Sequence, residues 1–164
     1  MASSLSSPVI LQILPALQQG GVERGTLEMA QAITQAGGKA LVASSGGRLV
    51  PMLRSLGAEH ITLPECGSRN PAHVWKNARV LARILGQHNV ALVHARSRIP
   101  ARTASMPCRR TRPAFVTTWH ALPANPMPAN TPSHSLLACG ARVLSLSAPS
   151  LRVLHHDSTV PSPR

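Results

Sequence analysis

Short, almost continuously apolar runs alternate with amphipathic segments of helical periodicity over the first 120 residues of the chain. The apolar runs predict strands at residues 8–14, 39–44, 60–64, 89–95 and 114–119. The intervening segments predict helices at residues 24–36, 48–57, 71–88 and 99–106. Strands without a polar face are typical of parallel sheets that helices cover on both sides. The alternation therefore predicts an α/β fold, a doubly wound parallel sheet with helices on both faces.

The length of 164 residues suits one domain with a sizeable core, and we expect residues 1–164 to form it. Asn70 followed by Pro71 predicts the start of the longest helix. Residues 121–134 contain four prolines and predict a loop. Beyond that loop we expect a sixth strand near residues 142–147 and then a last short helix.

Charge is unevenly distributed along this chain of net charge +12. Residues 1–65 contain four basic and four acidic side chains, whereas residues 66–156 contain twelve basic side chains and no acidic one. Such a field favours an anionic partner, which includes phosphate, lipopolysaccharide, phospholipid headgroups and nucleic acid. The only aromatic residues are Trp75, Phe115 and Trp119, so the chain has no stacking platform for single-stranded nucleic acid. Nucleic acid is therefore disfavoured as a partner.

The lengths of the apolar runs and the opening of the sequence predict a cytoplasmic protein. Its apolar runs are interrupted before they reach the ~20 residues that span a bilayer, and the opening has no basic region typical of a secretory signal. Cys66, Cys108 and Cys139 have no paired spacing. We expect them to be reduced and structural, in neither a zinc site nor a disulfide framework.

The first candidate site is the glycine turn between the first strand and the first helix, at Gly20 and Gly21. Glycines let a ligand approach the backbone, and the helix that follows points free N–H groups and its positive dipole end at the turn. The turn therefore suits a phosphate or another anion. The alternative is a tight turn that requires glycine for its own conformation. The turn has neither G-x-G-x-x-G nor the Lys-Ser/Thr of a P-loop, so nucleotide-cofactor motifs are unsupported.

A second group of candidates follows the fourth and fifth strands. His94, Arg96 and Arg98 end the fourth strand, and Arg102 lies one helical turn further on. His120 ends the fifth strand, which places a second imidazole at the same edge of the sheet. These groups suit a carboxylate or phosphate. The alternatives are a solvated basic loop and structural histidines.

Two other kinds of site are excluded. No acidic residue lies between Glu65 and Asp157, so a Ser-His-Asp hydrolase has no nearby carboxylate. The run His155, His156 and Asp157 has metal-binding side chains. Adjacent side chains on a helix diverge by about 100° and do not readily face one ion, so we expect no metal site.

The predicted helix 71–88 also carries a basic stripe, formed by Lys76, Arg79 and Arg83. Its two interpretations are a solvated helix face and a surface that docks on an anionic membrane.

Three motifs together resemble one protein family. GGVERGT follows the first strand, HARSR the fourth and TTWH the fifth. Residues 8–120 resemble the N-terminal half of GT-B glycosyltransferases of family 4, particularly bacterial lipopolysaccharide-type sugar transferases. The similarity is thinner from residue 142 onward.

The resemblance implies a Rossmann-like domain that binds the acceptor, paired in a two-domain enzyme with a half that binds a nucleotide sugar. Gly20 and Gly21 would approach the donor diphosphate or the acceptor, and His120 would be the catalytic residue that touches the transferred sugar. The implied acceptor-binding residues are Arg24, His94, Arg96 and Arg98. The implied chemistry is usually retaining and metal-independent, with the nucleotide sugar as co-substrate and no cofactor.

The sequence departs from the family pattern in two places. It stops where the family would enter its second domain, so we expect the donor-binding half to be absent, and Ala121 stands where glycine commonly follows the histidine. When complete, such an enzyme would transfer a hexose to a bacterial surface glycolipid or polysaccharide, at the inner face of the plasma membrane. We expect the chain alone to be a truncated, inactive form. The alternative is a basic, non-enzymatic module that binds anionic lipid or nucleic acid.

Overall fold

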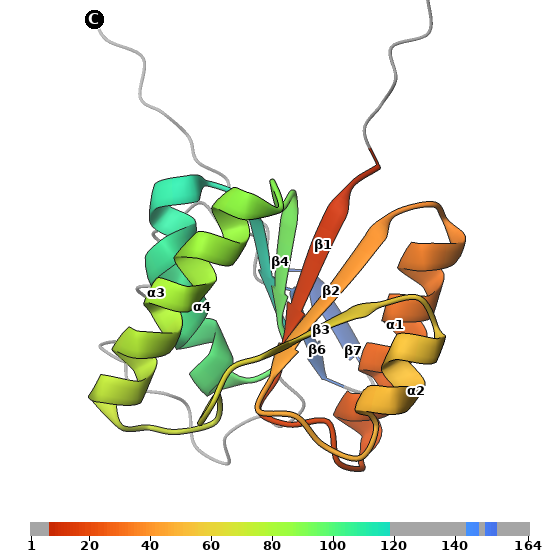
Figure 1. Ribbon diagram of the computed structural model, residues 1–164, viewed down its shortest axis with the longest axis horizontal. Helices are drawn as coiled ribbons and strands as arrows, with labels where there is room; N and C mark the ends of the chain where they lie inside the picture. Colours follow the sequence, from red (N-terminus) through yellow and green to blue (C-terminus); the bar gives the residue numbers. More distant parts are fainter. Residues whose placement is uncertain (1–6, 119–143, 148–149, 154–164) are drawn as a thin grey trace, which may run out of the picture.

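The computed structural model describes residues 7–118, 144–147 and 150–153. Five parallel strands form one sheet in the order β3-β2-β1-β4-β5. The strands are β1 (Val9–Ile13), β2 (Lys39–Ser44), β3 (Glu59–Thr62), β4 (Leu92–Ala95) and β5 (Ala114–Thr117). The helices are α1 (Gly21–Gln35), α2 (Val50–Ser55), α3 (Pro71–Gln87) and α4 (Arg98–Thr111). Helices α1 and α2 cover one face of the sheet and α3 and α4 the other, which confirms the predicted fold class (Figure 1).

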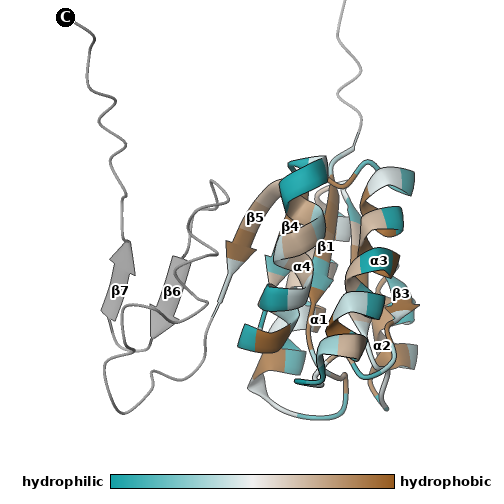
Figure 2. Cartoon of the chain, turned by 90° about the vertical axis from the view of Figure 1, so that its left-hand side faces the viewer, coloured by the Kyte–Doolittle hydropathy of each residue, from teal (hydrophilic) through white to brown (hydrophobic). Residues whose placement is uncertain are grey.

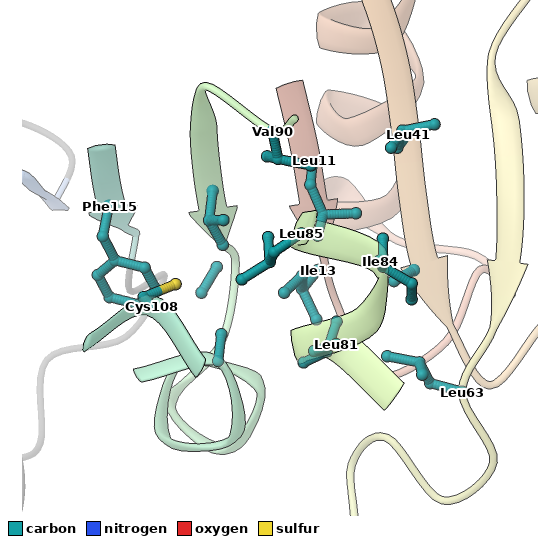
Figure 3. Close-up of a cluster of buried hydrophobic side chains, with 14 of the residues drawn as sticks. Leu11, Ile13, Leu41, Leu63, Leu81, Ile84, Leu85, Val90, Cys108 and Phe115 are labelled. Carbon is teal, nitrogen blue, oxygen red and sulfur yellow. The ribbon is translucent and has the colours of Figure 1, made fainter. Parts of the chain in front are cut away.

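The core consists of two apolar layers, one on each face of the sheet. Successive side chains of a strand point to opposite faces, so β1 contributes to both layers. Leu11 and Ile13 pack with Leu81 and Leu85 of α3 (Figure 3). On the other face, Ile10 of β1 and Leu14, just beyond the strand, pack with residues of α1 and α2. Figure 2 shows mainly hydrophobic residues in β4 and β5, and helices in which hydrophilic and hydrophobic residues are mixed. Burial on both faces explains why the strands are almost continuously apolar.

Two of the predicted helices differ from the expectation at one end. Helix α1 begins at Gly21 rather than at Arg24, because Arg24 already donates its backbone N–H to the carbonyl of Gly20 (3.0 Å). Helix α4 continues to Thr111, beyond the expected end near Met106. Pro107 removes one helical hydrogen bond. Buried packing of the α4 side chains against the sheet offsets that loss.

The start of α3 is confirmed. The side chain of Asn70 accepts a hydrogen bond from the backbone N–H of Ala72 (3.0 Å), and Pro71 is the first helical residue. The cap satisfies one of the N–H groups that a helix start leaves free.

The last part of the chain departs from the expectation. A strand forms at β6 (Leu144–Ser147), as predicted, but it pairs antiparallel with β7 (Ser150–Val153), where a short helix was expected. Polar and apolar residues alternate in both segments, and this two-residue period favours a strand over a helix. The proline-rich segment 121–134 lies outside the described residues.

Candidate functional site

The candidate site lies at the carboxyl edge of the parallel sheet. Strand β1 pairs with β4 and β4 with β5, so the three strands end side by side (Figure 1). The glycine turn follows β1, and the HARSR segment begins within β4. The topology therefore gathers most of the predicted residues at one edge, as doubly wound sheets do with their ligand sites. His120 lies outside the described residues.

The two glycines of the turn differ in their surroundings. Gly20 precedes α1 with a φ of 153°, and a Cβ there would lie 2.6 Å from Oε2 of Glu23. Gly21 is the first helical residue, and a Cβ there would meet nothing within 4 Å. The positive φ favours glycine at Gly20, whereas the Glu23 side chain could move away from a Cβ, so the conformation favours the tight-turn interpretation there. The Glu23 carboxylate also sits at the positive end of the helix dipole, where acidic side chains are stabilising.

The two arginines after β4 occupy different environments. Arg98 is exposed, whereas Arg96 is only 8% exposed. The guanidinium of Arg96 donates from Nη1 to Oε1 of Gln12 (2.9 Å). Arg24, the third arginine predicted to bind the acceptor, is exposed on α1. Arg96 is therefore not exposed to a ligand beside Arg98, as the sequence-based grouping of the two arginines had implied.

Sequence reasoning missed two residues that bind this buried guanidinium to helix α1. Gln12 is fully buried in β1, and its Nε2 donates to the backbone carbonyl of Thr26 (3.1 Å). Thr26, also fully buried, donates from Oγ1 to the carbonyl of Val22 (2.8 Å). We call Gln12, Thr26 and Arg96 the Gln12–Arg96 cluster. An amide inside an otherwise apolar strand was the available signal, because buried polar side chains need partners.

Burial has an electrostatic consequence for Arg96. Loss of hydration lowers the pKa of its guanidinium, while the nearby negative charge of Glu28 acts in the opposite direction. Arginine stays protonated in proteins, so a positive charge is held beneath α1. The Nε atom of Arg96 is buried and has no hydrogen-bond partner among the described residues. Such incompletely paired buried charge costs free energy.

His94 connects two strand ends. Its side chain lies on the same face of the sheet as Gln12, which is its register partner on β1. Its Nε2 lies 2.5 Å from Oγ1 of Thr118, just beyond the end of β5. The imidazole is half-buried and the threonine is buried. His94 therefore holds β5 beside β4 at the candidate edge, a structural role that one of the sequence alternatives anticipated.

A neighbouring loop holds the chain that leads into the glycine turn. Leu17 donates its N–H to the carbonyl of Gly46 (2.9 Å) and accepts from the N–H of Leu49 (2.9 Å). Arg48 donates from Nε to the carbonyl of Gln18 (3.0 Å). The segment 45–49 after β2 thus fixes the segment that connects β1 to Gly20.

A hollow of about 440 Å³ lies elsewhere, where β2 and β3 begin. Its charged walls include Lys39 and Glu59, which form an ion pair at 2.9 Å, and Arg54. His60 also lines it and shares a 2.9 Å hydrogen bond with Ser44. Burial, with Arg54 nearby, lowers the pKa of His60. Because the hollow opens at the amino edge of the sheet, it is separate from the candidate site.

Cysteines and metal-ligating groups form no site in the described ranges. No group of three or more His, Cys, Asp or Glu side chains there is arranged to hold a metal ion. Cys66 and Cys108 are buried and free of disulfides, and burial raises the pKa of Cys66 to about 12. That thiol is therefore unreactive at neutral pH. Cys139 and the run 155–157 lie outside the described residues.

The basic stripe of α3 is exposed. Lys76, Arg79 and Arg83 all face solvent, and the guanidinium of Arg79 lies 4.6 Å from the ring centre of Trp75. Trp75 itself is 56% exposed. Among the described helices, none is long and apolar enough to cross a membrane.

Comparison with known proteins identifies relatives of this architecture. A family model described as Glycosyltransferase Family 4 matches residues 19–162. A glycosyltransferase from Rickettsia africae ESF-5 is 34% identical with a TM-score of 0.73, over 85% of this chain and 37% of that one. MurG from Acinetobacter baumannii is 16% identical with a TM-score of 0.62, over 84% of this chain and 41% of that one. The comparison with curated proteins gives no match.

A UDP-GlcNAc 2-epimerase from Methanocaldococcus jannaschii is also similar, at 8% identity and a TM-score of 0.52, over 83% of this chain and 39% of that one. The likeness to MurG and to the epimerase concerns the fold alone. The chain spans 37% of the length of the Rickettsia glycosyltransferase and 41% of that of MurG.

Proposed function

Because the chain belongs to glycosyltransferase family 4, as an N-terminal domain of the GT-B fold, we propose that it is the acceptor-side half of a sugar transferase. The complete enzyme would move a hexose from a nucleotide sugar to a bacterial surface glycolipid or polysaccharide. The observation that carries the proposal is the family match over residues 19–162. The basic carboxyl edge supports it, because an anionic glycan or a phosphate is the kind of ligand that such an edge attracts.

The proposed reaction forms a bond between an acceptor hydroxyl oxygen and the anomeric carbon of the sugar. The bond from that carbon to the diphosphate oxygen breaks, and the acceptor proton is released. Positive groups and backbone N–H groups stabilise the negative charge that develops on the leaving diphosphate. In this proposal the turn at Gly20 and Gly21 approaches the anionic substrate and His120 touches the transferred sugar. The proposed chemistry uses the nucleotide sugar as co-substrate and needs no metal and no cofactor.

The exposed arginines give the first test. We expect Arg24→Glu combined with Arg98→Glu to weaken binding of lipopolysaccharide core oligosaccharide at least tenfold in a calorimetric titration. Both side chains are exposed at the candidate edge, so the reversal removes attraction and adds repulsion. The melting temperature should hardly change, because exposed substitutions alter stability by about 0.5 kcal/mol or less.

The matched control is Arg54→Glu combined with Arg110→Glu. It changes the net charge equally at two exposed positions outside the candidate site. An equal loss of binding in the control would mean that only net charge matters, and it would favour the non-enzymatic basic module. Unchanged binding in the Arg24 and Arg98 variant would remove both residues from the acceptor site.

We also propose that the exposed face of α3 contacts an anionic membrane, on the cytoplasmic side. Trp75 supplies an amphipathic ring, and Lys76, Arg79 and Arg83 supply positive charge. Neither α3 nor α4 contains an acidic residue, so no like charge on these helices opposes the lipid.

The membrane proposal predicts salt-sensitive binding to vesicles that contain phosphatidylglycerol. Binding should fall steeply between 0.1 and 1 M salt, as the Debye length shrinks from about 10 Å to about 3 Å. In a Trp119→Phe background, the emission of Trp75 should shift to the blue as the ring leaves water. Vesicles of phosphatidylcholine alone are the control. Salt-insensitive binding, or an unshifted emission, would contradict docking through this face.

A further inference from the structure

We infer that Arg96 is a positioning residue that fixes the first turns of helix α1 against the sheet, and thereby fixes the glycine turn. It does so through Gln12 and Gly25 rather than by contact with substrate. The inference deepens the proposed function, because this turn is the part of the chain assigned there to the anionic ligand.

The backbone of Arg96 is fixed to the sheet. The backbone N–H of Arg96 donates to the carbonyl of Ile13 (2.8 Å), which extends the ladder between β1 and β4 by one residue. From that point the side chain runs beneath α1 to Gln12, with 8% of its surface exposed. A long side chain that is anchored at both ends holds its tip in one place.

The helix is shaped to receive this tip. A Cβ at Gly25 would lie 2.9 Å from Nη2 of Arg96, closer than real Cβ contacts. Gly25 lies inside α1 and does not have a positive φ, so its backbone conformation does not require glycine. Glycine within a helix costs about 1 kcal/mol relative to alanine. A Cβ at this position would therefore displace the guanidinium of Arg96, which Gln12 holds through Nη1.

A series of hydrogen bonds connects Arg96 to the first turn of α1. Gln12 accepts from Arg96 and donates to the carbonyl of Thr26, and Thr26 donates to the carbonyl of Val22. Val22 belongs to the first turn of α1, which closes when Arg24 donates to the carbonyl of Gly20. Consecutive hydrogen bonds therefore link the sheet to the first turn of α1, next to the glycine turn.

Filling the space under α1 with an apolar side chain would avoid the free-energy cost of burying a charged guanidinium. Replacement of buried charges by well-packed hydrophobic residues is often neutral or stabilising. The Arg96 guanidinium has Gln12, a neutral acceptor, as its hydrogen-bond partner, and its buried Nε has none within the part of the chain that the structure describes. Directional bonding to Gln12 is what an apolar residue lacks, which is consistent with positioning rather than with packing alone.

Amide hydrogen exchange on the full chain tests the inference with four variants, which are Arg96→Met, Arg96→Lys, Gly25→Ala and the double variant Gly25→Ala with Arg96→Met. We expect Arg96→Met to speed exchange of the amides of residues 24–28 at least tenfold, while the amides of α3 keep their rates. Arg96→Lys should restore much of the protection, because its ammonium also donates to Gln12. Gly25→Ala should speed exchange in the presence of Arg96 and have little effect beside methionine.

Arg98→Met is the control, since it removes the same charge from an exposed position two residues further on. Equal acceleration in α1 and α3, or an effect of Gly25→Ala that is the same in both backgrounds, would overturn the inference. So would unchanged exchange in Arg96→Met.

Titration with inorganic pyrophosphate separates this inference from the proposed function. If the unmodified chain binds pyrophosphate, Arg96→Met should weaken binding and Arg96→Lys should recover it. If the unmodified chain binds none, the anionic site at the turn is refuted, and the exchange rates still decide whether Arg96 positions α1.

Discussion

Replacing Gly47 by alanine is expected to lower the free energy of unfolding by about 3 kcal/mol or more. Gly47 has a φ of 147°, a conformation that alanine adopts only with strain. A Cβ at this position would also overlap the backbone carbonyl of Leu17. The clash is with backbone atoms, so no side-chain rotation relieves it. Urea unfolding followed by circular dichroism measures the loss.

Gly46→Ala is the matched control, because it separates strain from collision. Gly46 also has a positive φ, 95°, but a Cβ there would meet nothing within 4 Å. Gly46→Ala should lower the free energy of unfolding only by the conformational strain, about 1–2 kcal/mol. Equal losses for the two variants would mean that the contact with Leu17 does not govern stability.

The collision at Gly47 has a consequence for the candidate site. Segment 45–49 holds the segment that leads from β1 to Gly20. If Gly47→Ala displaces it, exchange of the Leu17 amide should accelerate more than exchange within α3. The glycine turn is thus supported from two sides, by this loop and by the Gln12–Arg96 cluster beneath α1.

The periodicity of the sequence was sufficient to predict the order and type of the elements in the main sheet. Parallel strands covered on both faces are almost continuously apolar, so runs such as Val9–Ile13, in which Gln12 is the one polar residue, are recognisable without the structure. Boundaries were less accurate, because packing decides them. The predicted strand 89–95 shortens to Leu92–Ala95, where pairing with β1 and β5 begins. The helix expected near the end of the chain is instead β7, since antiparallel pairing with β6 determined its structure.

The candidate site was predictable in its location but not in its internal contacts. Strand ends follow from the pattern, so Gly20, His94 and Arg98 could be assigned to one edge. Whether Arg96 faces solvent depends on a detail of packing. Arg96 continues the alternation that places His94 on the α1 side of the sheet, and its guanidinium there lies close to Gly25, where a side chain would crowd it. The exposure of a side chain near a strand end can therefore be predicted only when the packing of the helix above it is known.

Charge reversal at Arg96 and charge reversal at Arg98 should have very different effects on stability. We expect Arg96→Glu to lower the free energy of unfolding by about 3–5 kcal/mol, because it buries an unpaired charge. The new carboxylate would face Oε1 of Gln12, so two acceptors would meet. A flip of the Gln12 amide would only move the conflict to the carbonyl of Thr26. Chemical denaturation at neutral pH measures the loss.

Arg98→Glu makes the same charge change and should alter the free energy of unfolding by about 0.5 kcal/mol or less. Arg98 is exposed and is the first residue of α4, where an acidic side chain interacts favourably with the helix dipole. Similar losses for the two variants would show that Arg96 is not buried in solution.

The pH dependence of the Arg96→Glu variant gives a further check on the same burial. Loss of hydration and the negative charge of Glu28 should both raise the pKa of the new carboxyl above the ~4.3 of an unfolded glutamate. A carboxyl whose pKa is higher in the folded state binds its proton more tightly there. Its destabilising effect is therefore largest at neutral pH and shrinks as the pH falls through the raised pKa. The Arg98→Glu variant should lack this recovery, because its carboxyl stays in water.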